Sequence, residues 1–138
     1  MRIHPLTILC IDDDSDDIEC FREALGAVDA SCVCMSALGA DEGLLVLETT
    51  VPDVIFLDIN MPRIDGHEAL VSIRKVKALD HVPVYMLSTS IFSEDLDGFK
   101  RDGATGGFRK PETFLGLCEI LDGVLSTFKS HEGAINGH

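Results

Sequence analysis

Short apolar runs alternate with longer amphipathic segments along most of the chain. The apolar runs are continuous and rich in aliphatic and β-branched residues, which is typical of strands that are covered on both faces. The fifth run is the weakest, because its two glycines lower its strand propensity. The predicted strands are Leu6–Ile11, Ser31–Leu38, Pro52–Ile59, Val82–Ser88 and Gly106–Lys110.

The segments between these runs show helical spacing of apolar residues. In the first of them, Ser15 is predicted to be the N-cap, Asp16 and Asp17 favour the first turn, and Gly26 ends the helix. Asp14 is expected to lie in the preceding loop. The predicted helices are Ser15–Gly26, Asp41–Thr50, Asp65–Leu79, Ser93–Gly103 and Pro111–Phe128.

Five strand–helix repeats predict an α/β fold, in which a parallel five-stranded sheet carries helices on both faces. The length of 138 residues fits one domain with a real hydrophobic core. We expect this domain to span residues 1–130 and residues 131–138 to form a flexible tail.

Composition narrows the range of functions. The net charge of −13 disfavours nucleic acid and anionic lipid as direct partners, and it suits cations or basic protein surfaces. No apolar run approaches the roughly 20 residues that span a bilayer, and the N-terminus is a poor signal peptide. Five scattered cysteines indicate reduced thiols. A cytoplasmic location is therefore the expectation.

Polar residues follow the carboxyl ends of the predicted strands, where ligands bind in folds of this class. A phosphate-binding loop would carry glycine or hydroxyl residues after the first strand, but this chain carries aspartates, which repel phosphate. Mg²⁺ fits such carboxylates best, because it is a hard cation that also bridges to phosphate oxygens. The residues gathered at this edge are Asp12, Asp13, Asp58, Ser88 and Lys110.

Four sequence blocks carry a family resemblance. "ILCIDDD", "PDVIFLDINMPRIDG", "PVYMLSTS" and "RKP" resemble the signature blocks of the response-regulator receiver domain of two-component signalling, in order and with the usual spacing over about residues 6–128. The resemblance implies a flavodoxin-like, doubly wound (βα)₅ fold with strand order 2-1-3-4-5. It also implies a cis peptide bond before Pro111.

The same resemblance assigns roles to the site residues. It implies that Asp58 is the phosphoacceptor, that Lys110 is the lysine of the family's site and that Ser88 is the switch hydroxyl. Mg²⁺, or Mn²⁺ in its place, would be held by Asp13, Asp58 and the backbone carbonyl of Asn60, with Asp12 binding directly or through water. Apart from self-phosphorylation and slow self-dephosphorylation, no enzymatic activity is expected.

The resemblance also implies partners. A histidine kinase or a histidine phosphotransfer protein would donate the phosphoryl group to this single-domain chain, and an unknown downstream protein would receive the signal. The fourth helix, fifth strand and fifth helix form the family's usual contact face, and a homodimer through this face is left open.

One position departs from the family pattern. Most receivers carry Tyr or Phe three residues before the lysine, where this chain has Gly107. Phe108 follows, but on a strand it points to the opposite face, so it is predicted to be a core residue. We therefore hypothesise that output runs through the Ser88–Ile91 loop and the helix after it, rather than through a rotating ring.

Two other functions compete with phosphoacceptor signalling as interpretations of this sequence. A phospho-independent pseudo-receiver would bind partners without accepting phosphate, and Gly107 keeps this alternative open. A Mg²⁺-dependent phosphatase of the haloacid dehalogenase class also uses an aspartate nucleophile, but it needs a general acid two residues later. Asn60 occupies that position and cannot act as an acid, which disfavours the phosphatase.

Overall fold

A five-stranded parallel sheet forms the centre of the molecule. The computed structural model describes residues 5–61, 64–89 and 93–136. The strands run in the order β2-β1-β3-β4-β5, as predicted. Each strand lies within one or two residues of its predicted bounds: β1 (Thr7–Asp12), β2 (Val33–Leu38), β3 (Val54–Asp58), β4 (Val84–Ser88) and β5 (Gly106–Arg109).

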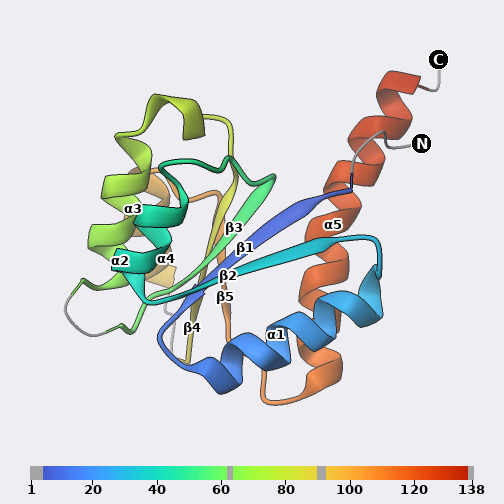
Figure 1. The fold of residues 1–138 in the computed structure, drawn as a ribbon, viewed down its shortest axis with the longest axis horizontal. Helices are drawn as coiled ribbons and strands as arrows, with labels where there is room; N and C mark the ends of the chain where they lie inside the picture. Colours follow the sequence, from blue (N-terminus) through green and yellow to red (C-terminus); the bar gives the residue numbers. More distant parts are fainter. Residues whose placement is uncertain (1–4, 62–63, 90–92, 137–138) are drawn as a thin grey trace.

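Five α-helices cover the sheet in two layers, with α1 and α5 on one face and α2, α3 and α4 on the other (Figure 1). Their bounds are α1 (Ser15–Val28), α2 (Ala40–Val46), α3 (Gly66–Arg74), α4 (Ser93–Arg101) and α5 (Phe114–Asn136). Within the described residues, no helix combines the length and the apolar character needed to cross a membrane.

The alternation of side chains along the strands divides the core into two clusters. Along β3, Ile55 and Leu57 join the cluster under α2, α3 and α4, whereas Val54 and Phe56 join the cluster under α1 and α5. Both sets are fully buried. The strands are therefore apolar on both faces, which explains why their sequences are continuous apolar runs.

Several helix ends differ from the prediction. Helix α1 continues past Gly26 to Val28, and α2 stops at Val46 rather than at Thr50. Asp14, not Ser15, is the N-cap of α1, and its carboxylate accepts a hydrogen bond from the Asp16 amide. The predicted helix Asp65–Leu79 stops at Arg74, and a 3₁₀ turn covers Lys77–Leu79. The Arg74 guanidinium donates to the carbonyls of Leu79, Val82 and Gly103, and these bonds hold the chain where it turns toward β4.

The C-terminal part of the chain differs from the prediction in two respects. Helix α5 was expected to end at Phe128, but it continues to Asn136 and enters the segment predicted to be a tail. The domain boundary at residue 130 stays a prediction. The expected cis peptide bond before Pro111 is wrong, because no cis peptide bond occurs in the described residues. The trans isomer is the intrinsically favoured one, by about 0.5–1 kcal/mol for a bond to proline.

Candidate functional site

Three carboxylates meet where β1 and β3 end. Asp12, Asp13 and Asp58 can each place one oxygen within 4.8 Å of the others. Strands β1 and β3 pair directly, so the parallel register brings residues 46 positions apart in sequence to the same edge. Asp12 and Asp58 are buried, with 3% and 4% of their surface exposed, whereas Asp13 is exposed. Uncompensated burial of two carboxylates is costly, so the site requires positive charge.

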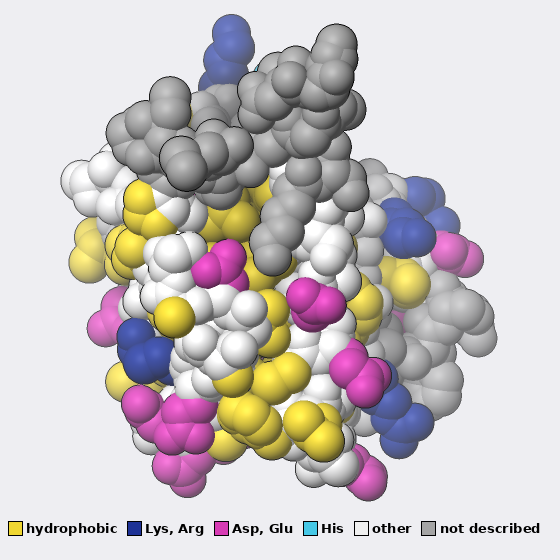
Figure 2. Space-filling view, turned by 90° about the vertical axis from the view of Figure 1, so that its right-hand side faces the viewer, with side chains coloured by type: hydrophobic (Ala, Val, Ile, Leu, Met, Phe, Trp, Pro, Cys, Tyr) yellow, Lys and Arg dark blue, Asp and Glu magenta, His cyan; other side chains and the backbone are white. Residues whose placement is uncertain are grey.

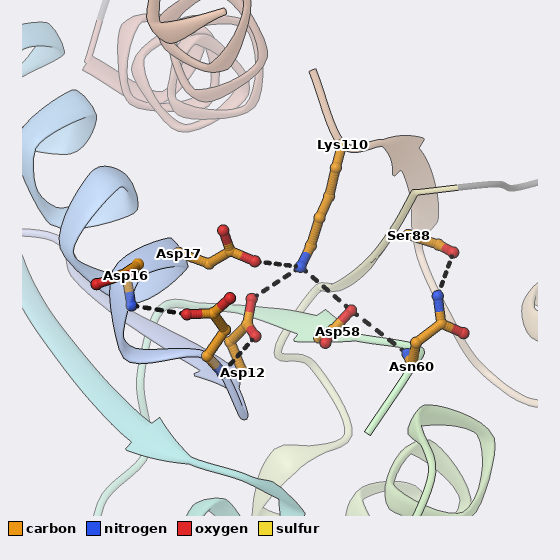
Figure 3. A network of polar contacts seen from close by, with 8 residues as sticks. Asp12, Asp16, Asp17, Asp58, Asn60, Ser88 and Lys110 are labelled. Carbon is orange, nitrogen blue, oxygen red and sulfur yellow. Dashed lines mark hydrogen bonds and ion pairs between the residues drawn. The ribbon is translucent and has the colours of Figure 1, made fainter. Parts of the chain in front are cut away.

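Lys110 supplies that charge from the loop after β5. Its Nζ lies 3.0 Å from Asp12 Oδ2, 2.9 Å from Asp17 Oδ2 and 3.4 Å from Asp58 Oδ1. Figure 3 shows the ammonium group between the start of α1 and the end of β3. The predicted gathering of Asp12, Asp58 and Lys110 is therefore present in the structure, although the sequence separates Asp12 from Lys110 by 98 positions.

Burial and charge shift the acidity of this cluster. Burial is the main cause that raises the pKa of Asp58 to about 6; the neighbouring Asp12 raises it further, and Lys110 opposes the rise. Burial also raises the pKa of Asp12, against the hydrogen bonds from the Asp14 amide and from Lys110. For Lys110, burial acts to lower the pKa, but hydrogen bonds to Asp17 and Asp12 outweigh it and hold the pKa above its usual value.

A second, uncharged group of contacts lies beside Asp58. The Asn60 amide faces Asp58 Oδ1 at 3.4 Å, and Asn60 Nδ2 donates to Ser88 Oγ at 3.2 Å. Ser88 is buried at the end of β4. The Asn60 side chain therefore links the predicted switch hydroxyl to the loop that directly follows the phosphoacceptor candidate.

Close packing fixes the loop after Asp58. A Cβ atom on Gly66 would lie 2.6 Å from Ile59 Cα and 2.7 Å from Asp58 O, which is too close for any other residue without a backbone shift. The Gly66 amide donates to the Ile59 carbonyl. Gly66 thus lets α3 begin directly against the end of β3, and Asp65 caps that helix by accepting from the Glu68 amide.

Strand alternation explains which site residues face each other. Asp12, Asp58 and Lys110 each follow, at a spacing of two, residues that face the α1–α5 layer, namely Cys10, Phe56 and Phe108. Ser88 follows Met86, which faces the α2–α4 layer. The charged network and the Asn60–Ser88 pair therefore lie toward opposite faces of the sheet. This division can be read from the sequence, because residues two positions apart on a strand face the same side of the sheet.

The residues at and after Gly107 behave as expected from parity. Phe108 packs against the α1–α5 cluster, and its ring lies 5.6 Å from that of Tyr85 between centroids. Phe108 is half-buried and packs against this core cluster, on the face that its position in the strand predicts. Gly107 pairs with Met86 on the other face. The Ser88–Ile91 loop of the output hypothesis lies partly outside the described residues, so that hypothesis stays a prediction.

Sequence reasoning missed the role of Asp17. It was assigned only to the first helical turn of α1, yet its carboxylate binds Lys110 more closely than Asp12 or Asp58 does. A cavity of about 280 Å³ opens at this point between α1 and the start of α5, and its lining includes Asp12, Asp17, Lys110 and Phe114. The contact between Asp17 and Lys110 could have been anticipated from their positions, because the first turn of α1 and the end of β5 lie at the same edge of the sheet.

The oxygen donors at this edge fit a hard divalent cation. Asp12, Asp13 and Asp58 are close enough to hold one ion together, and carboxylate oxygens are ligands that Mg²⁺ and Mn²⁺ accept. Lys110 and the Asp14 amide already engage Asp12, whereas Asp13 is exposed. The acidic pocket could therefore bind a metal ion, with Asp13 as the ligand most accessible to it.

Comparison with known proteins identifies the family. The sequence matches the response regulator receiver domain over residues 8–122. The chain is a member of this family. The receiver domain belongs to two-component signalling, and membership of this family implies phosphoacceptor signalling.

Curated relatives show the same domain in proteins of different length. Protein PilG of Pseudomonas aeruginosa is 35% identical over 119 residues, which cover 86% of this chain and 82% of PilG. A probable C4-dicarboxylate response regulator, DctR of Bacillus subtilis, is 31% identical over 104 residues, which cover 75% of this chain but 45% of DctR. The chain therefore spans less than half of that regulator.

Solved structures agree with the fold. The phosphorylated cyanobacterial phytochrome response regulator RcpA is 27% identical with a TM-score of 0.78, and the match covers 87% of this chain and 91% of RcpA. The chemotaxis response regulator CheY4 of Vibrio cholerae is 28% identical with a TM-score of 0.78, and the match covers 87% of this chain and 98% of CheY4. These similarities support the receiver fold over most of the chain.

Proposed function

We propose that Asp58 of this receiver domain accepts a phosphoryl group from a phosphohistidine donor and that the resulting acyl phosphate changes protein–protein contacts. The observation that carries this proposal is the buried Asp58 carboxylate, which lies 3.4 Å from the Lys110 ammonium and beside two further aspartates. The phosphorylated state named for RcpA, a relative of similar fold, supports the same chemistry.

The chemistry is a nucleophilic displacement at phosphorus. An Asp58 oxygen forms the new P–O bond while the P–N bond of the donor breaks, and its electron pair returns to the imidazole nitrogen. Positioning and charge neutralisation supply most of the catalysis in such transfers. Lys110 places a positive charge beside Asp58, where it can pair with a phosphoryl oxygen.

A metal ion would complete the neutralisation of charge. We propose that Mg²⁺, or Mn²⁺ in its place, is held by Asp13, Asp58 and the Asn60 backbone carbonyl, with Asp12 directly or through water. The ion supplies positive charge to the phosphoryl oxygens when it is bound. The chain's own contribution is the carboxylate cluster that gathers within 4.8 Å.

Partner contact is the proposed output. Receiver domains interact with histidine kinases and with downstream effectors, and we propose a histidine kinase or histidine phosphotransfer protein as donor. Figure 2 shows the side of the molecule that carries α5, where apolar side chains gather near acidic ones. Phe114 and Leu115, at the start of α5, are 46% and 71% exposed. A partner with an apolar and basic surface fits this side.

Intact-mass measurement tests the phosphoacceptor directly. Incubation with acetyl phosphate or phosphoramidate plus Mg²⁺ is expected to add one phosphoryl group, which hydroxylamine removes because it is an acyl phosphate. Phosphoramidate carries the P–N bond of a phosphohistidine. Asp58→Asn should abolish the gain, whereas Asp65→Asn, at the exposed α3 cap, should retain it. EDTA should suppress it.

The same experiment separates the pseudo-receiver alternative, which Gly107 keeps open. A wild-type protein that gains no phosphoryl group from either donor, although it is folded, would favour a phospho-independent binding module. Persistence of the gain in Asp58→Asn would instead place the phosphoacceptor at another residue and overturn the assignment of Asp58.

A further inference from the structure

The ammonium group of Lys110 is shared among three carboxylates. It has three N–H donors, and it faces Asp17 at 2.9 Å, Asp12 at 3.0 Å and Asp58 at 3.4 Å. The longest of the three distances is the one to Asp58, the residue that the phosphoryl group would occupy. Asp12 and Asp17 flank the start of α1, so both contacts draw the ammonium toward that helix (Figure 3).

A phosphoryl group on Asp58 needs one of these donors. Two of the N–H groups are hydrogen-bonded to Asp12 and Asp17, whereas the ammonium group lies 3.4 Å from Asp58. A phosphoryl oxygen on Asp58 therefore gains a short hydrogen bond from Lys110 most readily when the ammonium group moves away from one of the other two carboxylates. Asp12 is buried and also accepts from the Asp14 amide, which fixes its position. Asp17 is the more exposed partner, with 46% of its side chain accessible. Water can replace the lysine at Asp17 at little cost.

We propose that Asp17 is a positioning residue that holds Lys110 away from Asp58 in the resting protein and releases it to the phosphoryl group. This inference rests on the proposed function of Asp58. Asp17 thereby competes with the nucleophile for Lys110 and slows phosphorylation. The Asp17 carboxylate also lines the cavity of about 280 Å³ beside Lys110.

Removing the competing carboxylate should accelerate phosphoryl transfer. In Asp17→Asn, the lysine has two strong acceptors left and moves toward Asp58, so the rate of phosphorylation by acetyl phosphate should rise by about threefold to tenfold, a change typical of one nearby charge in a partly solvated site. Asp17→Glu keeps the charge and should stay closer to the wild-type rate.

Asp16→Asn is the matched control. It removes the same charge from the neighbouring position in the same helical turn, and within the described residues Asp16 makes no contact with Lys110. Both variants therefore change the long-range attraction of an anionic donor in the same way, and both lose a favourable charge at the start of the helix. Rates that rise equally in the two variants, or a rate that stays the same or falls in Asp17→Asn, would overturn the proposal.

A second readout needs no phosphorylation. The ¹⁵N signal of the Lys110 ammonium group, assigned by its loss in Lys110→Arg, should shift in Asp17→Asn and stay in place in Asp16→Asn. An unchanged signal in Asp17→Asn would show that the carboxylate does not hold the lysine, and it would end the proposal. If the wild-type protein accepted no phosphoryl group, the function of Asp58 would fail while this signal still tested the ion pair.

Discussion

The two faces of the sheet build two different environments around Asp58. On the α1–α5 side, Asp58 faces a charged network of Lys110, Asp12 and Asp17. On the α2–α4 side, the contacts run through the uncharged Asn60 and Ser88. Charge on one side suits the binding and transfer of a phosphoryl group. The neutral side has a hydroxyl that can respond to the product without disturbing the charge balance.

The charged side should control the rate of the reaction. Lys110→Met removes the positive charge beside Asp58 and leaves the carboxylates uncompensated, so phosphorylation by acetyl phosphate should slow by about 100-fold, the loss that follows removal of one electrostatic donor from an active site. Intact mass over time measures the rate. Lys100→Met, on exposed α4, is the control. If Lys110→Met slowed phosphorylation by less than about threefold, the charged side would not control the rate of the reaction.

The charged side should also limit stability. The pKa of Asp58 is raised to about 6, against about 3.9 in an unfolded chain. The folded protein therefore holds a proton that the unfolded chain has released between these values, and stability falls as pH rises through about pH 4 to 6. At pH 7 and without Mg²⁺, Asp58→Asn should raise the free energy of unfolding by up to about 3 kcal/mol.

Urea unfolding at two pH values measures this effect. The advantage of Asp58→Asn should shrink at pH 4, where most of the folded wild-type protein carries the proton. A variant that is less stable than the wild type at pH 7 would show that Lys110 more than offsets the burial of the Asp58 carboxylate.

Close packing on the neutral side should be sensitive to added volume. Gly66→Ala places a Cβ atom against the backbone of Asp58 and Ile59, so the free energy of unfolding should fall by about 1–3 kcal/mol. Gly26→Ala is the control, because nothing lies within 4 Å of its Cβ position in α1, and it should stabilise the protein by roughly 0.5–1 kcal/mol. Equal effects of the two variants would mean that the α3 start tolerates a backbone shift.

The neutral side should affect the reaction least. Ser88→Ala removes the hydroxyl that accepts from Asn60, which should cost about 1 kcal/mol of stability and change the phosphorylation rate by less than about threefold. Ser126→Ala, an exposed hydroxyl on α5, should change neither quantity. If Ser88→Ala slowed the reaction as much as Lys110→Met, the charged side would not be the side that controls the reaction rate.

The sequence by itself determined the fold and the main members of the site. Continuous apolar strands that alternate with helices indicated a parallel sheet, because strands of this kind are typical of parallel sheets covered by helices on both faces. Asp12, Asp58 and Lys110 followed from the rule that groups at the carboxyl ends of parallel strands meet. Helix ends were predicted less well. Asp14 and Ser15 are equally suitable N-caps by residue type, and the carbonyl groups that bind Arg74 include one that is distant in sequence.

Only the tertiary structure decided how the charges are shared. Spacing indicated that Asp17 lies in the first turn of α1, but not that its carboxylate reaches a lysine 93 positions away. The direction of a long lysine side chain depends on which acceptors surround its flexible end, and those acceptors come from β1, α1 and β3 together. Strand parity sets the face on which a residue lies, whereas packing sets which partner it holds.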